Sequence, residues 1–307
     1  MSQVIAPARI SSIDEQPAFF EAGAETLFGI LTRPRAQERD SALIMVPSAE
    51  RLGYRNRVGA MLSHGLAERG HQAFRFNYRG CGESTGKAGR FRIADLFTTD
   101  AVGATAWLRG QGVERFLYSG SCFGARTALA AAAQEPATAG VILVAMPLTD
   151  SSPGEYGRLT PAGTARPSLA RRALRLQTLR DLRDPDLRRL YREAVRIKLR
   201  RMARRSVMPT DPMTTISPQV LRSLTSLVER RVQILFLYGE RDHAHAEFLE
   251  ASKTAAFGDL LEQAGDAVQI RVLPGQLHGW VSIPVGATAV DHMIDWVSRV
   301  DRRTQPV

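Results

Sequence analysis

The sequence predicts an α/β fold with a mostly parallel sheet, helices on both of its faces and a helical insertion. Short apolar runs typical of buried strands alternate with stretches of helical spacing along most of the 307 residues. Such alternation favours parallel strands joined by helices. The alternation stops at about 149–228, where arginine-rich helical spacing takes over. We therefore predict a core of residues 1–148 and 229–307 and a basic helical lid insertion at 149–228.

Bulk composition limits the class of protein. Apolar residues make up 44% of the chain, which is enough for a full core, and no apolar run reaches the length of a membrane span. The first residues lack the pattern of a signal peptide. Only two cysteines occur, so a cytoplasmic chain with reduced thiols is the simplest interpretation. We expect neither a metal nor a cofactor.

The first half of the chain supplies two hairpin strands and then buried strands with helices between them. The hairpin turns at Gly23, and the later apolar runs end in glycine-rich or polar turns. The predicted strands are 18–22, 26–32, 42–46, 72–76 and the run that opens at Phe116. The predicted helices are 58–69, which ends at Gly70, 93–108, with Leu96, Ala101 and Trp107 facing inward, and an Ala-rich helix after Gly124.

The second half resumes the same pattern after the insertion. Strands are predicted at 139–145, 232–238 and 268–273, and helices near 245–263 and 287–301. Within the insertion, apolar residues after Pro185 recur at helical spacing with arginines on the other faces.

Charge is concentrated in the insertion. Residues 156–206 hold 16 Lys/Arg and 4 Asp/Glu, and the whole chain has a net charge of +10. This segment therefore carries the basic character of the protein, which favours binding of phosphates or of an acidic protein. The alternative is a solvated, arginine-rich helix face without a partner.

The candidate nucleophile is Cys122, within Gly120-Ser-Cys-Phe-Gly124. An apolar strand precedes this stretch and an Ala-rich helix follows it, as in the G-x-S-x-G elbow. The elbow requires tiny residues two before and two after the nucleophile, and only Cys122 has glycines there. Ser119 and Ser121 are the weaker candidates. A buried thiol with a packing role is the structural alternative.

A thiol nucleophile needs a base, and the base needs an orienting acid. Asp242 follows the strand at 232–238, and His278 follows the strand at 268–273. Carboxyl ends of parallel strands meet at one edge, so these residues and Cys122 can converge there. Glu240 is the nearest substitute acid. The other histidines, taken singly, are better explained as surface or core residues.

Acyl transfer also needs hydrogen-bond donors for an oxyanion. The backbone N–H of Phe123, directly after the nucleophile, supplies one donor. The loop after the strand at 42–46 supplies the second, from Ser48 or Ala49. We assign substrate contacts to Glu50 and Arg51 of that loop and to Trp280, close to His278.

Together these pieces resemble the α/β-hydrolase superfamily, and most closely the serine-aminopeptidase-like group that includes exosortase-associated hydrolases. Further matching pieces are Phe19-Phe20, Leu27–Leu31 with Pro34, and Asn77-Tyr-Arg-Gly-Cys-Gly-Glu-Ser84. Two departures stand out: Pro47-Ser48 replaces the usual His-Gly, and cysteine replaces serine. Dienelactone hydrolases, polyester synthases and bile-acid-CoA amino-acid acyltransferases carry cysteine at this place, so the resemblance implies covalent acyl chemistry.

The leading functional hypothesis is a thioesterase or acyltransferase with a Cys122–His278–Asp242 triad. Its substrate would be a small-molecule thioester of coenzyme A or of an acidic acyl carrier protein held by the basic insertion. The alternative is a carboxylester or lactone hydrolase, and a remote alternative is a non-catalytic binding member of the fold. No motif supports nucleic-acid binding.

Overall fold

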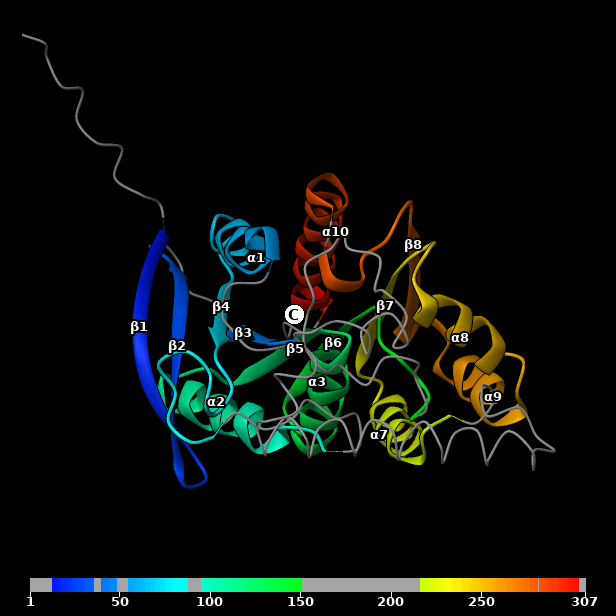
Figure 1. The fold of residues 1–307 in the computed structure, drawn as a ribbon, viewed down its shortest axis with the longest axis horizontal. Coiled ribbons are helices and arrows are strands. Elements are labelled where there is room, and N and C mark those ends of the chain that lie inside the picture. The colour runs from blue at the N-terminus through cyan, green and yellow to red at the C-terminus, as the bar shows by residue number, and fades with distance from the viewer. Residues whose placement is uncertain are drawn as a thin grey trace, which may run out of the picture. The chain divides into compact units, whose positions relative to one another are not determined.

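In the part of the chain that the structure describes, the strands form one eight-stranded sheet (Figure 1). The computed structural model describes residues 13–35, 40–48, 55–87, 95–150, 216–280 and 282–303. The strands are β1 (Ile13–Ala22), β2 (Glu25–Pro34), β3 (Ser41–Val46), β4 (Gln72–Phe76), β5 (Arg115–Ser121), β6 (Thr138–Val144), β7 (Gln233–Gly239) and β8 (Val268–Leu273). Their order is β1-β2-β4-β3-β5-β6-β7-β8, antiparallel from β1 to β4 across β2 and parallel from β4 to β8.

Helices cover both faces of this sheet, as Figure 1 shows. They are α1 (Val58–Ala67), α2 (Thr98–Gly110), α3 (Phe123–Gln134), α7 (Pro218–Glu229), α8 (His243–Ala251), α9 (Ala255–Ala264) and α10 (Ile283–Arg303). One buried apolar cluster joins the sheet to α2, α3, α7, α8 and α9, and a second joins it to α1 and α10. The central strands β3 to β7 alternate their buried side chains between the two clusters.

The predicted fold class is confirmed, and the strand bounds of β3 to β8 agree to within one or two residues. Two helix predictions were wrong in detail. α2 begins at Thr98 rather than near Ile93, because Phe97 turns out of helical geometry and packs its ring 4.9 Å from that of Tyr78. The helix predicted at 245–263 is two helices, because Thr254 is extended and starts α9 as its N-cap.

Most of the predicted insertion, residues 151–215, lies outside the described residues. The helix predicted after Pro185 and the basic segment 156–206 fall there. The end of the predicted insertion is α7, whose Val220, Leu224 and Leu227 are buried in the same cluster as α3. None of the helices in the described part of the chain is long and apolar enough to cross a bilayer.

Candidate active site

Cys122 occupies a strained turn between β5 and α3. Its backbone angles are φ 54° and ψ −114°, a region that non-glycine residues rarely adopt. The Cys122 N–H donates to the carbonyl of Val144 at 2.8 Å, which anchors the turn to the end of β6. This is the elbow geometry that the sequence predicted. Cys122 is also the N-cap residue of α3, and a helix dipole favours a thiolate at the helix N-terminus.

Both positions that flank Cys122 need glycine, because backbone atoms of neighbouring residues leave no room for a Cβ atom there. A Cβ on Gly120 would lie 2.3 Å from the carbonyl oxygen of Gly124, and a Cβ on Gly124 would lie 2.3 Å from that of Pro47. Real Cβ contacts are essentially never that short. The turn therefore folds back on itself and also packs against the loop that follows β3.

The two neighbouring serines do not share this geometry. Ser119 and Ser121 are both in β5 and are 3% and 2% exposed. The hydroxyl of Ser121 is buried and has no hydrogen-bond partner in the described part of the chain. Of these three residues only Cys122 has the positive φ of the turn, and it is itself buried, at 6% exposed. Cys122 and the other cysteine, Cys81, are not joined by a disulfide.

Asp242 joins the loop after β7 to the loop after β8. Its buried carboxylate accepts hydrogen bonds from the N–H groups of Gly239 at 2.7 Å, Leu277 at 3.1 Å and His278 at 2.9 Å. Because three backbone donors surround it, the carboxylate is fixed in place. The structure thus brings together two of the three residues predicted to form a triad, from different strand ends.

His278 opens a short 3₁₀ turn, His278–Trp280, at the carboxyl end of β8. Burial lowers the pKa of His278 from its usual value, whereas the negative charge of Asp242 opposes that shift. The ring is therefore mostly neutral near pH 7, as a general base must be. Glu240, the substitute acid, lies on the surface and pairs with Arg241 at 3.6 Å. Asp242 is therefore the better-placed acid.

The predicted oxyanion donors lie next to the elbow where the structure describes them. Phe123 is the first residue of α3, where helix N–H groups carry partial positive charge. Ser48 follows Pro47, whose carbonyl oxygen lies too close to Gly124 to allow a Cβ atom there. Ala49, Glu50 and Arg51 lie outside the described residues. Their predicted roles, like those of Phe123 and Ser48, stay predictions.

Trp280 was predicted to contact substrate, and the structure gives it a packing position. Its side chain is 5% exposed and belongs to the apolar cluster between the sheet, α1 and α10. Its carbonyl accepts a hydrogen bond from Asn56 Nδ2 at 2.6 Å. The residue thereby holds the His278 turn against the start of α1.

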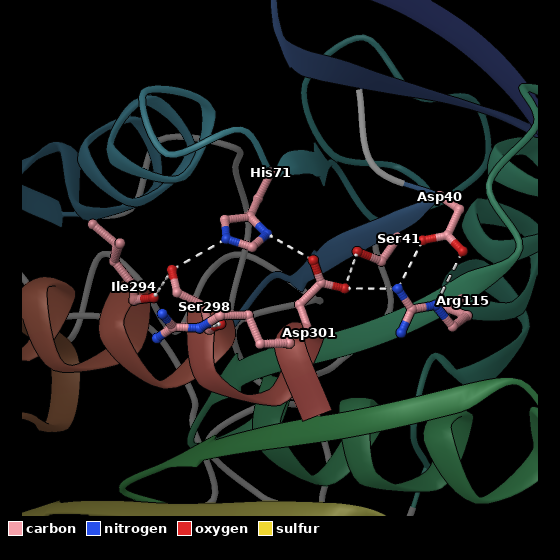
Figure 2. Close-up of polar contacts among 8 residues, drawn as sticks. Asp40, Ser41, His71, Arg115, Ile294, Ser298 and Asp301 are labelled. Carbon is pink, nitrogen blue, oxygen red and sulfur yellow. Dashed lines mark hydrogen bonds and ion pairs between the residues drawn. The ribbon is translucent and has the colours of Figure 1, made fainter. Parts of the chain in front are cut away.

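A group of hydrogen-bonded Ser, His and Asp side chains, separate from the candidate triad, lies at the other edge of the sheet (Figure 2). Ser298 Oγ lies 3.1 Å from His71 Nε2, and His71 Nδ1 lies 3.3 Å from Asp301 Oδ2. However, Ser298 is inside α10, and its hydroxyl also donates to the carbonyl of Ile294 at 2.9 Å. The surrounding N–H groups of α10 serve the helix itself, so the backbone around Ser298 does not form an oxyanion hole.

The group formed by Ser298, His71 and Asp301 is better explained as a structural link between elements. Asp301 also accepts hydrogen bonds from Ser41 Oγ at 2.7 Å and Arg115 Nη2 at 2.9 Å, which tie α10 to β3 and β5 (Figure 2). An adjoining open cavity of about 420 Å³ is lined by Arg69, His71, Asp295, Ser298, Arg299 and Arg302. Arginines at the end of α10 complement its dipole. The cavity is at the amino ends of the strands, opposite Cys122.

Sequence reasoning missed one buried charge near the elbow. Arg126 is in α3, and its side chain is 1% exposed. It donates to Asp150 Oδ1 at 2.8 Å and to Ser217 Oγ at 2.9 Å. The signal was present in the sequence, because Arg126 is the lone charged residue of an otherwise apolar, Ala-rich helix. A charge in that setting must be paired when buried.

Comparison with known proteins agrees with this fold. A sequence model of the family Hydrolase_4, described as serine aminopeptidase, S33, matches residues 53–281. No match was found among curated proteins. Among solved structures, the Pyrococcus furiosus esterase Pf2001 is similar with a TM-score of 0.58 at 13% identity, covering 97% of this chain and 98% of that one.

Two further solved structures have the same architecture. The dienelactone hydrolase of Anabaena variabilis has a TM-score of 0.55 at 15% identity, covering 94% of this chain and 98% of that one. The proline iminopeptidase of Mycobacterium smegmatis has a TM-score of 0.54 at 16% identity, covering 94% and 100%. At such identities the likeness concerns the fold, and chemistry has to be argued from the site.

Proposed function

Because the chain belongs to the Hydrolase_4 family of serine aminopeptidase-like (S33) proteins and is an α/β hydrolase, we propose that it hydrolyses carboxylic esters or lactones through an acyl intermediate on Cys122. The similar structures include an esterase and a dienelactone hydrolase, which supports an ester substrate over a thioester. The argument for a thioester depends on the basic segment 156–206, which lies outside the described residues.

The proposed reaction proceeds in two halves. His278 accepts the proton of the Cys122 thiol, and the sulfur attacks the carbonyl carbon of the ester. The N–H groups of Phe123 and of the Ser48 loop stabilise the oxyanion. The tetrahedral intermediate then expels the alcohol, which takes the proton from His278. In the second half, His278 deprotonates water, which attacks the acyl-thioester carbon and releases the carboxylic acid and the thiol. Asp242 orients the imidazole throughout.

One observation carries the proposal: Cys122 is held at φ 54° between two glycines that tolerate no Cβ. Backbone strain of this kind persists where surrounding structure enforces it, and such strain clusters at active sites. A cysteine with only a packing role needs no such turn. The Asp242–His278 contact at the same edge of the sheet supports the same proposal.

The decisive experiment is trapping of the acyl group. Purified protein is incubated with p-nitrophenyl acetate, a lactone and an acyl-coenzyme A, and released product and intact mass are followed. We expect turnover of the ester or lactone and a mass increase of one acyl group on Cys122. Cys122→Ala should lose both, by at least about 10³-fold in rate. Cys81→Ala is the matched control, because Cys81 is buried in another turn and should leave both unchanged.

A thioesterase or acyltransferase activity is the second candidate function. A cysteine nucleophile and the net positive charge of residues 156–206 favour it, since coenzyme A and acyl carrier proteins are acidic. Faster acylation by acyl-coenzyme A than by p-nitrophenyl acetate, with transfer to an added amine or thiol, would establish acyl transfer instead of ester hydrolysis. Full ester turnover by Cys122→Ala would contradict both candidates, and no turnover of any substrate by the unaltered protein would favour a binding role.

A further inference from the structure

Arg126 is a buried cation on the helix that begins beside Cys122. It lies one helical turn after Cys122, and its N–H approaches the Cys122 carbonyl at 3.3 Å. Side chains of an α-helix lean toward its N-terminus. The guanidinium of Arg126 therefore extends back over the first turn of α3, on the side of the elbow. Its side chain is 1% exposed, so water screens this charge little.

The guanidinium joins the two chain segments that border residues 151–215. Its Nη2 donates to Asp150 and to Ser217, and its Nη1 lies 3.4 Å from the carbonyl oxygen of Pro147. The N–H of Ser217 in turn donates to the carbonyl of Leu148 at 2.8 Å, so the two segments lie side by side. One cation thus fixes both segments to the helix that carries the elbow.

Arg126 and Cys122 both contact the chain at the carboxyl end of β6: the Cys122 N–H donates to Val144, and Arg126 Nη1 reaches Pro147 three residues later. Burial lowers the pKa of Arg126, whereas the negative charges of Asp150, Glu247 and ionised Cys122 raise it. Arginine stays protonated under all ordinary conditions. The attraction between two opposite charges is mutual. The positive guanidinium of Arg126 therefore stabilises the thiolate form of Cys122.

Other titratable groups around this site act in opposite directions. Asp150 and Glu247 partly neutralise Arg126; Asp150 is 53% exposed and Glu247 is 2% exposed. Glu247 is itself held by the N–H of Leu148 at 3.1 Å and lies 3.2 Å from His243 Nδ1. His278 and its partner Asp242 follow β8 and β7 at the same edge of the sheet. Removing the Asp150 carboxylate should therefore strengthen the stabilisation of the thiolate by Arg126. The direction of the resulting change in thiol reactivity then tests the role of Arg126.

We propose that Arg126 is a positioning residue that stabilises the thiolate of Cys122 and holds the segments around residues 147–150 and 216–217 beside it. The proposal rests on the proposed function in taking Cys122 as the reacting thiol. Its test reads the thiol directly, so the two can fail separately: turnover by Cys122→Ala would defeat the proposed function, and the alkylation profile of Cys122 would still decide the role of Arg126.

The experiment measures alkylation of Cys122 by iodoacetamide against pH, with the modified peptide quantified by mass spectrometry. In Arg126→Met, we expect the rate at pH 7 to fall about tenfold or more, because loss of a nearby opposite charge disfavours the thiolate. Arg126→Lys keeps the charge and should keep most of the rate. Asp150→Asn should raise the rate, because the guanidinium then lacks its direct carboxylate partner.

Arg230→Met is the matched control. Arg230 also joins α7 to α3, through the carbonyls of Ala132 at 3.1 Å and Glu135 at 2.8 Å, but at the far end of α3, about 15 Å along the helix from Cys122. It should leave the profile unchanged. A folded Arg126→Met protein with the profile of Arg230→Met would overturn the proposal. Should Arg126→Met fail to fold, Asp150→Asn decides, and a rate equal to or below that of the unaltered protein overturns it.

Discussion

At the scale of single residues, the elbow depends on the two glycines that flank Cys122. We predict that Gly120→Ala and Gly124→Ala each destabilise the protein by more than about 3 kcal/mol or prevent folding, because each new methyl group meets backbone at 2.3 Å. Backbone cannot move aside as a flexible side chain can. Urea unfolding followed by circular dichroism measures the loss.

Gly110→Ala gives the comparison for this prediction. Gly110 ends α2, and a Cβ there would have no neighbour within 4 Å. Alanine is the better helix former, so this variant should be unchanged or more stable by up to about 1 kcal/mol. Equal stability of all three variants would contradict the close packing of the elbow.

The pH dependence of activity follows from the burial of His278. Burial lowers the pKa of its ring below the usual 6.5, so the neutral base persists to lower pH than in an exposed histidine. We predict that the acid limb of kcat/KM for ester hydrolysis lies below pH 6.5, with activity lost as pH falls through the lowered pKa. Initial rates between pH 4 and 9 measure this limb.

Asp242→Asn provides the opposing test at the same site. The negative charge of Asp242 raises the pKa of His278, so its removal should move the acid limb to still lower pH. The rate should also fall by roughly 10³–10⁴-fold, because the imidazole loses its orienting partner. An acid limb that moves upward in Asp242→Asn would contradict this assignment of the base.

At the scale of elements, α10 is fastened to the sheet by Asp301. Burial raises the pKa of Asp301, but hydrogen bonds from His71 and Ser41 and the charges of His71 and Arg115 outweigh burial and hold the pKa well below its usual range. The stability that this depressed pKa contributes is present above the usual aspartate range and is lost as pH falls below it.

We predict that Asp301→Asn lowers the free energy of unfolding by about 1–3 kcal/mol at pH 7, because Ser41 and Arg115 lose a buried charged acceptor while Arg115 keeps its pair with Asp40. Its stability should also decline less steeply than that of the unaltered protein below about pH 4. Denaturant unfolding at pH 7 and pH 3 measures both effects.

Asp295→Asn is the control on the same helix. Asp295 and Arg69 form an ion pair whose side chains are 56% and 47% exposed. Exposed pairs contribute at most about 1 kcal/mol, so this variant should remain close to the unaltered protein at both pH values. A comparable loss in both variants would show that α10 is not held mainly through Asp301.

Elements were predictable from the sequence where their signal is local. The apolar runs of β3 to β8 and the glycines around Cys122 needed no tertiary information, because strands buried on both faces and a tight turn each have a distinct composition. The start of α2 and the break before α9 were missed. Phe97 leaves helical geometry to join an aromatic cluster, and Thr254 competes as an N-cap, and neither choice shows in spacing.

The residues of the candidate site also differ in how far the sequence alone could predict them. Cys122, Asp242 and His278 could be chosen because each follows a predicted strand in the order of the fold. Arg126 could not be paired in advance, since Asp150 and Ser217 are 24 and 91 positions away in the sequence. Contacts of that kind depend on the path of the chain between the elements, which periodicity does not encode.

At the scale of the whole molecule, the two apolar clusters are formed by residues on either side of 151–215. Asp150 and Ile216 are the described residues on either side of 151–215, and the Ser217 N–H donates to the Leu148 carbonyl at 2.8 Å. A short linker can therefore connect the two points at little cost in loop-closure entropy. The core described here should not need the intervening residues to fold.

We predict that replacing residues 151–215 with a short Gly/Ser linker leaves a soluble protein that unfolds cooperatively, as measured by thermal circular dichroism and calorimetry. Replacing 149–228 should fail, because it also removes α7, whose buried Val220, Leu224 and Leu227 each contribute about 1.5–3 kcal/mol. This pair of variants therefore locates the boundary of the insertion at the start of α7. Aggregation of the shorter replacement would instead assign residues 151–215 a part in the core, and equal stability of both would remove α7 from it.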